Sequence, residues 1–227
     1  MNWSNVKGRR CLVPDGHKPY LGLMLTALSP GWSGRAFRWF VDRILNRHFE
    51  RILIEPQGPI PCGPLLVLAN HVGWWDAFLV HRINQVLFRH RYHVLMLEPE
   101  LSKQPFFRRM GAFSWHRGDR AEALKGVGYA AGLLTDPSNL VLIFPQGEIR
   151  SQYLDRVRFG SAARWIARRA GPAVKIVFVS MLLDYALWSR PTATLRWAVD
   201  TGEGGCRLAD RFNSFLASAK ERQVAAT

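Results

Sequence analysis

The sequence predicts an α/β fold in which a mixed, largely parallel sheet is layered by helices. Residues 65–69 and 140–144 form two apolar runs without charge, and residues 173–183 form a third hydrophobic run, as strands buried on both faces do. Between these runs, residues 77–87, 119–134 and 159–170 carry apolar side chains at helical spacing. Strands that alternate with helices along the chain favour a sheet covered by helices.

The other segments are assigned from their apolar periodicity and their turn residues. The sequence predicts a helix at 33–49 capped by Ser33, a short helix at 105–110 and a closing helix at 208–222. Strands are expected at 51–55, 93–97 and 111–116, with a peripheral strand at 193–199 and loops at 56–64 and 98–104. The 227 residues thus divide into a basic N-terminal segment, 1–50, and an α/β domain, 51–227.

The helix expected at 33–49 is amphipathic and basic. Phe37, Phe40, Val41 and Ile44 share one face, and arginines occupy the other. Such a helix is typical of a segment that lies in a membrane interface, but its apolar face could equally pack on the domain core. The longest early apolar run, residues 20–28, is much shorter than the roughly 20 residues of a spanning helix, so we expect no membrane crossing.

The formal net charge of +14 and the sequence pI of about 10.7 indicate a polyanionic partner. Arginine greatly outnumbers lysine, and its planar fork suits phosphate oxygens. Nucleic acid, an anionic membrane surface and a phosphorylated small substrate all satisfy this signal. A nucleic-acid module would concentrate basic residues and exposed aromatic residues in one stripe, whereas here the basic residues are spread along the chain.

The three cysteines are odd in number and widely separated, at Cys11, Cys62 and Cys206. They favour neither a disulfide framework nor a zinc site, so the sequence predicts no metal and a reducing cytosolic setting. His90 and His93 have metal-like spacing but no third ligand type nearby, and we interpret them as ordinary residues.

A histidine and an aspartate follow the first buried strand directly. His71 lies just beyond residues 65–69, and Asp76 begins the helical segment that follows. On one continuous helix, five steps of roughly 100° would leave the two side chains about 140° apart. They can meet only if His71 lies in the turn and Asp76 in the first helical turn. An imidazole held by a carboxylate at a strand end is a candidate general base, although a purely capping and supporting pair fits the spacing equally well.

The second uncharged strand ends in another turn rich in functional side chains. Residues 144–151 read Phe-Pro-Gln-Gly-Glu-Ile-Arg-Ser. A Pro-x-Gly turn exposes backbone N–H groups, and Arg150 adds a fork for an anion.

Taken together, these motifs resemble those of the glycerolipid acyltransferase family, the lysophosphatidic acid acyltransferases. The hallmark Asn-His-x-x-x-x-Asp is matched from Asn70 to Asp76. The Gly-to-Arg spacing of a Gly-x-x-Phe-Ile-Asp-Arg element is kept by Gly111 and Arg117. Phe-Pro-Glu-Gly-Thr-Arg-Ser is approximated by residues 144–151, and the resemblance extends from about residue 49 to residue 183.

The resemblance implies an enzyme that moves a fatty acyl group from an acyl-CoA or acyl-carrier-protein thioester to a hydroxyl of a lysophospholipid-type acceptor such as 1-acylglycerol-3-phosphate. His71 and Asp76 would be catalytic, with His71 as general base and Asp76 orienting its ring. The resemblance assigns substrate binding to five residues of the two downstream motifs: Arg117, Gln146, Gly147, Glu148 and Arg150. Backbone N–H groups near Gly147 would stabilise the oxyanion. The thioester is a co-substrate, and no further cofactor is implied.

The expected partners are an anionic membrane surface, a lipid acceptor and the acyl carrier, and the expected location is cytoplasmic and peripheral, on the inner face of the membrane. Nucleic acid is not an expected partner. Trp74 and Trp75 could flank the acyl chain or fill the core.

Departures from the family pattern concern the acceptor. Gln146 replaces an acid, and Glu148-Ile149 stands where one threonine would be. Glu98 occupies a position where we expect a lysine. These changes motivate an alternative acceptor such as a glycolipid, a carotenoid glycoside or an aminolipid. A non-catalytic nucleic-acid-binding protein and a lipid-binding relative without turnover are the alternatives from other classes.

Overall fold

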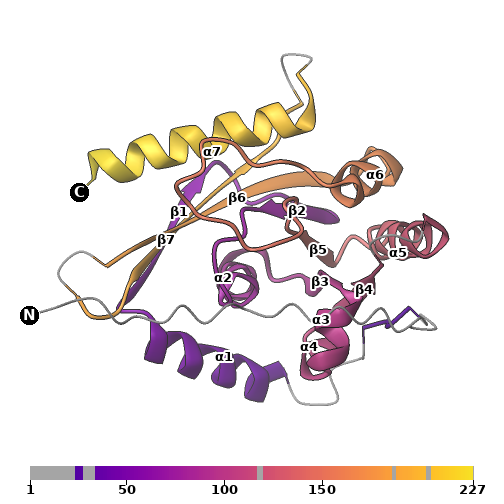
Figure 1. Cartoon of the computed structure of the whole chain (residues 1–227), viewed down its shortest axis with the longest axis horizontal. Helices are drawn as coiled ribbons and strands as arrows, with labels where there is room; N and C mark the ends of the chain where they lie inside the picture. Colours follow the sequence, from indigo (N-terminus) through magenta and orange to yellow (C-terminus); the bar gives the residue numbers. More distant parts are fainter. Residues whose placement is uncertain (1–23, 28–33, 117–119, 186–187, 203–205, 227) are drawn as a thin grey trace, which may run out of the picture.

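A seven-stranded sheet forms the centre of the computed structural model, which describes residues 24–27, 34–116, 120–185, 188–202 and 206–226 (Figure 1). The strands are β1 (Arg51–Gln57), β2 (Leu65–Ala69), β3 (Arg91–Leu97), β4 (Ala112–Trp115), β5 (Asn139–Ile143), β6 (Lys175–Asp184) and β7 (Thr192–Val199). Their order across the sheet is β1-β7-β6-β2-β5-β3-β4, and every pair is parallel except β6 with β7. The predicted mixed, largely parallel sheet is therefore confirmed.

Helices cover both faces of the sheet, as Figure 1 shows. On one face lie α1 (Gly34–His48) and α2 (Asp76–Ile83), which runs into a π-helical turn, η1 (Asn84–Phe88). Two short helices, α3 (Glu98–Lys103) and α4 (Phe106–Arg109), contribute to the same apolar cluster. On the other face lie α5 (Arg120–Leu133), α6 (Ser161–Arg169) and α7 (Leu208–Ala225).

The central strand β2 explains why the core has two halves. Its five residues are all fully buried, and their side chains alternate between the two layers. Leu65, Val67 and Ala69 join the cluster under α1 and α2. Leu66 and Leu68 join the cluster under α5, α6 and α7. Because both faces are covered by helices, the strand has no polar face, as the uncharged run predicted.

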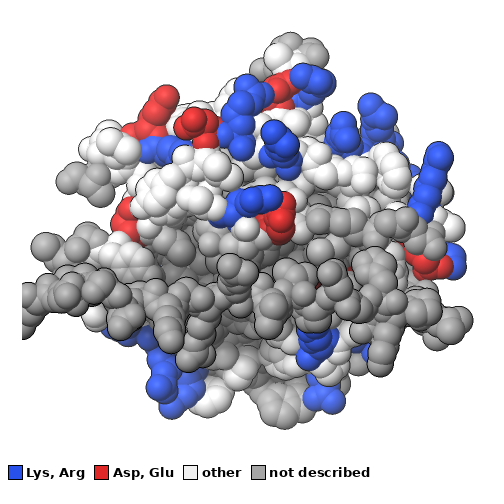
Figure 2. Space-filling model, viewed as in Figure 1, with Lys and Arg blue, Asp and Glu red and all other residues white. Residues whose placement is uncertain are grey.

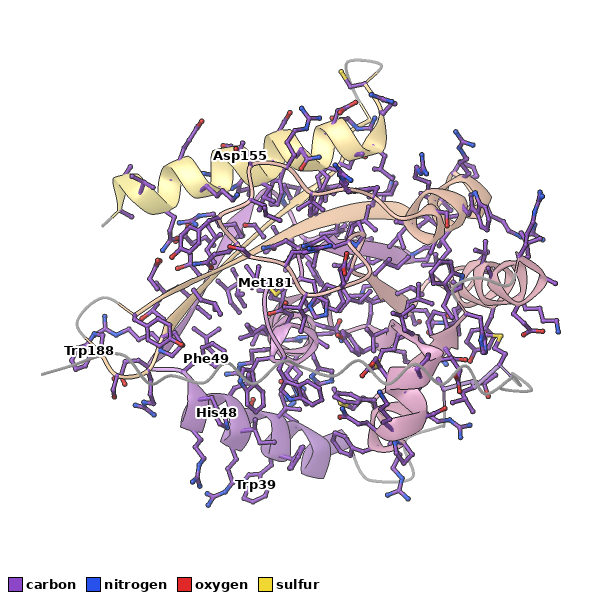
Figure 3. The ribbon with its side chains drawn as sticks, viewed as in Figure 1. Trp39, His48, Phe49, Asp155, Met181 and Trp188 are labelled. Atoms are coloured by element: carbon purple, nitrogen blue, oxygen red, sulfur yellow. The ribbon has the colours of Figure 1, made fainter. Side chains whose placement is uncertain are left out.

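The apolar face of α1 packs on the core. Val41, Leu45 and Phe49 are buried within the cluster that also contains β2 and α2. An ion pair of 2.8 Å between Arg82 of α2 and Asp42 of α1 joins the two helices. Figure 3 shows Phe49 on the side of α1 nearest the sheet and Trp39 on the far side. The sequence left open whether this apolar face lies in a membrane interface or packs on the domain core, and in the structure it packs on the core.

Two local predictions were wrong. The strand at 193–199 is not peripheral, because β7 lies inside the sheet and β1 forms the edge. Its Arg196 is buried but neutralised by Glu55, with Nε–Oε2 2.7 Å apart, and it also donates to Gln223. Residues 98–104 do not form a loop, because α3 occupies 98–103 with Pro99 in its first turn and Leu101 buried. No helix within the described part of the chain is both long and apolar enough to span a bilayer.

Candidate active site

The site lies at the carboxyl edge of the sheet, where two adjacent parallel strands end. β2 pairs with β5 in the register Leu68 to Ile143, so the segments that follow the two strands are neighbours. The first is the β2–α2 turn, residues 70–75, and the second is the β5–α6 loop, residues 144–160. In parallel α/β sheets this edge is where ligands bind.

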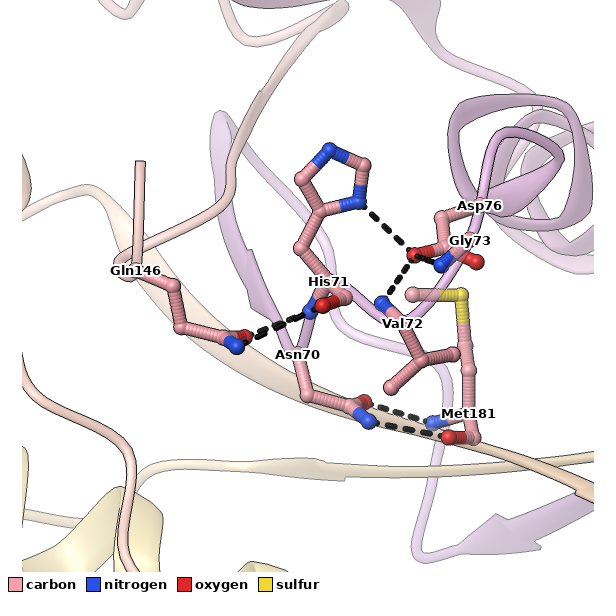
Figure 4. A network of polar contacts seen from close by, with 7 residues as sticks. All are labelled: Asn70, His71, Val72, Gly73, Asp76, Gln146 and Met181. Atoms are coloured by element: carbon pink, nitrogen blue, oxygen red, sulfur yellow. Dashed lines mark hydrogen bonds and ion pairs between the residues drawn. The ribbon is translucent and has the colours of Figure 1, made fainter. Parts of the chain in front are cut away.

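His71 and Asp76 meet as the sequence predicts. His71 lies in the turn, Asp76 is the first residue of α2, and His71 Nδ1 lies 2.8 Å from Asp76 Oδ2 (Figure 4). The same carboxylate oxygen accepts the backbone N–H groups of Val72, at 2.5 Å, and Gly73, at 2.9 Å. The Asp76 side chain is 1% exposed, and the start of a helix favours its negative charge. The carboxylate is thus fixed before any ligand binds.

The ring of His71 is held by a hydrogen bond to Asp76 and by stacking on Phe144. In the neutral imidazole, the proton lies on Nδ1 and the lone pair on Nε2, because the carboxylate oxygen of Asp76 accepts the hydrogen bond. Figure 4 shows Nε2 on the side of the ring away from Asp76. The imidazole stacks on Phe144 at a centroid distance of 4.1 Å and an interplanar angle of 14°. The His71 side chain is 22% exposed.

His71 lines a cavity of about 600 Å³, which we call the apolar cavity. Most of its wall is hydrophobic, formed by β3, α4 and the start of α6 together with the aromatic rings of Trp74, Phe107 and Trp115. Glu100, Gln104 and Glu148 add polar groups. Trp74 lines this cavity and is 49% exposed, whereas Trp75 packs on His48 of α1 at a ring distance of 4.1 Å. Trp75 thus packs against the core, as one of the two alternatives has it, and Trp74 borders the cavity.

Gln146 contacts the backbone of His71 from the β5–α6 loop. Its Oε1 accepts the His71 N–H at 2.5 Å, and its Nε2 donates to the His71 carbonyl at 3.3 Å. The backbone N–H of Arg150 donates to the same carbonyl at 2.9 Å. Asn70, one residue earlier, bonds both the N–H and the carbonyl of Met181 in β6. The turn that carries His71 is therefore held from the β5–α6 loop, through Gln146 and Arg150, and from β6, through Asn70 (Figure 4).

The other sequence-predicted residues lie around the same loop. Gly147 has φ +68°, and its N–H donates to the carbonyl of Phe144, so this N–H is already engaged. Glu148 lines the apolar cavity and forms an ion pair of 2.6 Å with Arg150. Arg150 does not line that cavity but a second one on the other side of the loop. Arg117 lies outside the described residues.

This second cavity, the arginine groove, has a volume of about 1190 Å³. It lies between the β5–α6 loop, α6 and the start of α7, and Glu148 lines both it and the apolar cavity. Figure 2 shows basic side chains gathered on this face over α6 and the start of α7. Seven arginines line the groove: Arg150, Arg156, Arg158, Arg164, Arg168, Arg207 and Arg211.

Sequence reasoning missed this groove. The only local signal was the i, i+4 spacing of Arg164 and Arg168, which places these two arginines on one face of a helix. The other arginines come from a loop and from a segment more than 35 residues later, so their proximity cannot be predicted from local spacing. Within the described ranges, no group of three His, Cys, Asp or Glu side chains clusters closely enough to hold a metal ion.

A family model described as Acyltransferase matches residues 51–182, which is more than half of the chain. No protein of curated function matches the chain. The matched segment runs from β1 into β6, and it contains both the β2–α2 turn and the β5–α6 loop. The last helix, α7, which supplies part of the arginine groove, lies beyond the match.

Proposed function

The chain belongs to the acyltransferase family, and from this premise we propose that it transfers a fatty acyl group from a thioester to a hydroxyl of a lysophospholipid-type acceptor such as 1-acylglycerol-3-phosphate. The observation that carries the proposal is the His71–Asp76 pair, whose imidazole lines the apolar cavity. A cavity with hydrophobic walls suits an alkyl chain, and an oriented imidazole suits proton removal from a hydroxyl.

In the proposed reaction, His71 Nε2 takes the proton of the acceptor hydroxyl while the hydroxyl oxygen attacks the thioester carbonyl. Asp76 keeps the ring in the correct tautomer and stabilises the imidazolium that forms. Collapse of the tetrahedral intermediate breaks the C–S bond, and the imidazolium returns the proton to the departing thiolate. The products are an ester and a free thiol, and the thioester is the only co-substrate that the reaction needs.

The developing oxyanion needs N–H donors close to the thioester carbonyl. Since the Gly147 N–H is engaged by Phe144, the proposal assigns this role to the next N–H groups along the loop, those of Glu148 and Ile149. Both residues line the apolar cavity with His71, and neither N–H donates to an acceptor within the part of the chain that the structure describes.

Substitution of His71 tests the proposal directly. We expect His71→Ala to reduce kcat about 10²–10⁴-fold, the usual cost of losing a general base. Asp76→Asn should also reduce kcat, because an amide no longer enforces the tautomer with the proton on Nδ1. Thioester consumption by the purified variants measures both effects, with circular dichroism as a check of folding. Near-normal turnover by folded His71→Ala would exclude the proposed base.

The acidic groups of the apolar cavity favour a second class of acceptor. Glu100 and Glu148 both line the cavity that His71 lines, each paired with one cation, Lys103 at 3.6 Å and Arg150 at 2.6 Å, and a carboxylate still accepts hydrogen bonds from an ammonium group but not from a phosphate dianion. An acceptor without phosphate, such as an aminolipid or a glycolipid, is the alternative they support. A panel of acceptors offered with one labelled donor decides between the two classes. Turnover of lysophosphatidate alone would exclude the alternative.

We also propose that the protein is a peripheral protein of the cytoplasmic face of a membrane, bound through the outer face of α1. Trp39 is 64% exposed there, with the guanidinium of Arg43 5.7 Å from its ring, and Arg38 and Arg47 are exposed beside it. An aromatic residue among arginines suits an anionic interface. Trp39→Ser should reduce flotation with anionic vesicles, whereas Trp188→Ser, which changes another half-exposed tryptophan, should not. Equal flotation of both variants would contradict the role of α1.

A further inference from the structure

The arginine groove has more positive charges than the carboxylates that line it can neutralise. It contains seven arginines but only two carboxylates, Glu148 and Asp210. Glu148 pairs with Arg150 at 2.6 Å, and Asp210 pairs with Arg156 at 2.7 Å and with Arg207 at 3.2 Å. Each groove carboxylate is thus already neutralised from within the groove, so the groove as a whole retains a large positive surplus.

Three arginines account for much of the surplus. Arg158, Arg164 and Arg168 are exposed, and no ion pair joins them to an acid in the described part of the chain. Arg164 and Arg168 are four residues apart on α6, so they lie side by side and repel each other. A multiply charged anion between them would relieve this repulsion.

The walls of the groove are held in place without a ligand. Asn213 of α7 accepts the Val157 N–H at 2.7 Å and donates to the Val157 carbonyl at 3.1 Å. Gln152 bonds the N–H and the carbonyl of Leu183 in the same way, with both distances 2.9 Å. These bonds attach the β5–α6 loop to α7 and to β6. The arginines of the loop are therefore presented by a backbone that is fixed at both ends of the groove.

The groove lies next to the cavity of the catalytic candidate, because the two share a lining residue. Glu148 lines both the groove and the apolar cavity that His71 lines. A ligand with phosphates in the groove and a flexible arm over the loop at Glu148 would present its far end to His71. Coenzyme A has this form, because its nucleotide carries a 3′-phosphate and a 5′-pyrophosphate and its pantetheine arm ends in the thiol that bears the acyl group.

From this arrangement we infer that the arginine groove binds the phosphates of the coenzyme A nucleotide, so that the acyl donor is an acyl-CoA. This inference rests on the proposed function, since it identifies the donor of that reaction. A single acceptor phosphate would occupy one or two guanidinium forks, whereas the groove has three arginines outside ion pairs with described acids and four more that are paired. A concave groove of about 1190 Å³ exceeds the roughly 300–1,000 Å³ of common small-molecule sites and suits a ligand as large as a nucleotide better than the convex surface of a carrier protein.

The test compares acyl-CoA with acyl-pantetheine, which lacks the nucleotide and its phosphates. In the double variant Arg164→Gln/Arg168→Gln, the ratio of kcat/KM for acyl-CoA to kcat/KM for acyl-pantetheine should fall about tenfold or more, the effect of one lost charge-assisted hydrogen bond. The loss should appear in KM for acyl-CoA. Arg169→Gln is the matched control, because Arg169 is exposed on the same helix but does not line the groove.

Two kinetic results would overturn the inference. The first is an unchanged ratio in the double variant, whether both kcat/KM values are retained or both fall equally; an equal fall would place the arginines in another role. The second is a loss confined to an acyl-carrier-protein donor, which would make the groove a docking site for an acidic protein.

A binding measurement separates this inference from the proposed reaction. Adenosine 3′,5′-bisphosphate titrated into the full chain in a calorimeter needs no turnover. Binding by the wild type that the double variant loses, and that Arg169→Gln keeps, would support the groove even if no acyl transfer occurred. Unchanged binding in the double variant would exclude the groove even if His71→Ala abolished acyl transfer.

Discussion

At the scale of single residues, the site is assembled by amide side chains that each bond both polar groups of one distant peptide residue. An amide offers one acceptor oxygen and two donor hydrogens, so it can satisfy an N–H and a C=O at once. The pairs are Asn70 with Met181, Gln146 with His71, Gln152 with Leu183 and Asn213 with Val157. Three of the four fix the β5–α6 loop against β2, β6 or α7.

The sequence predicted the catalytic candidates but not these partners. His71 and Asp76 could be predicted because a fixed local spacing at a strand end determines whether they meet. The partner of Gln146 is 75 residues away, and the sequence led us to expect a substrate contact there. The local sequence does not distinguish an amide side chain that contacts a ligand from one that bonds a backbone, because either would occupy the same position just after the strand.

Variants of Gln146 distinguish these two roles. Gln146→Leu removes both bonds to the His71 backbone, so the ring should lose its position and kcat should fall about tenfold to a hundredfold. Gln146→Glu keeps an acceptor for the His71 N–H and should restore most of the activity. A role in substrate binding would instead raise KM at unchanged kcat in both variants. Steady-state kinetics with one substrate varied while the other is saturating measure both kcat and KM.

At the scale of elements, the strands buried on both faces could be predicted because they consist of uninterrupted apolar residues. β2 and β5 lie within one residue of their predicted ends. The two failures have different causes. β7 lies inside the sheet because Glu55 neutralises its buried Arg196 and Gln223 accepts a hydrogen bond from it, and both partners are far away in the sequence. In α3, Glu98 and Pro99 are both favourable in a first helical turn.

The β5–α6 loop should owe its order to α7. Asn213 is 8% exposed, and Asn213→Ala would leave the buried N–H of Val157 without its acceptor. We expect the free energy of unfolding to fall by about 1–3 kcal/mol. Urea denaturation measures it. Ser214→Ala, at the next and exposed position of α7, is the matched control and should change stability by less than about 0.5 kcal/mol. Equal stability of Asn213→Ala and the wild type would show that the loop does not depend on α7.

At the scale of the whole molecule, composition predicted an anionic partner but could not place it. The net charge of +14 is a property of the whole chain, and many arginines are consumed in ion pairs, such as Arg211 with Asp200 at 2.7 Å. The surplus becomes a site only where the fold brings the β5–α6 loop, α6 and α7 together around one groove. A single loop separates the arginine groove from the apolar cavity, which would give the two ends of the proposed acyl-CoA donor different environments.

Acid should destabilise the folded protein through a histidine remote from the proposed chemistry. His81 of α2 is 9% exposed and packs edge-on against Tyr92 at 4.9 Å. Burial, and to a lesser extent the charge of Arg38, lowers the pKa of His81 from 6.5 to about 4. Between these two values the unfolded chain binds a proton that the folded chain does not. Stability therefore falls as the pH drops from about 6.5 towards 4, by about 3 kcal/mol from this group.

His81→Phe keeps an aromatic ring at this position and removes the titration. Its free energy of unfolding should therefore depend less on pH between about 6.5 and 4 than that of the wild type. Some dependence should remain, because burial also lowers the pKa of His93, with the same sign. Urea denaturation of both proteins at several pH values in this window gives the two slopes. The comparison uses slopes because the substitution can also change stability at neutral pH. Identical slopes would mean that the acid sensitivity of the fold arises elsewhere than in the packing of α2 on β3.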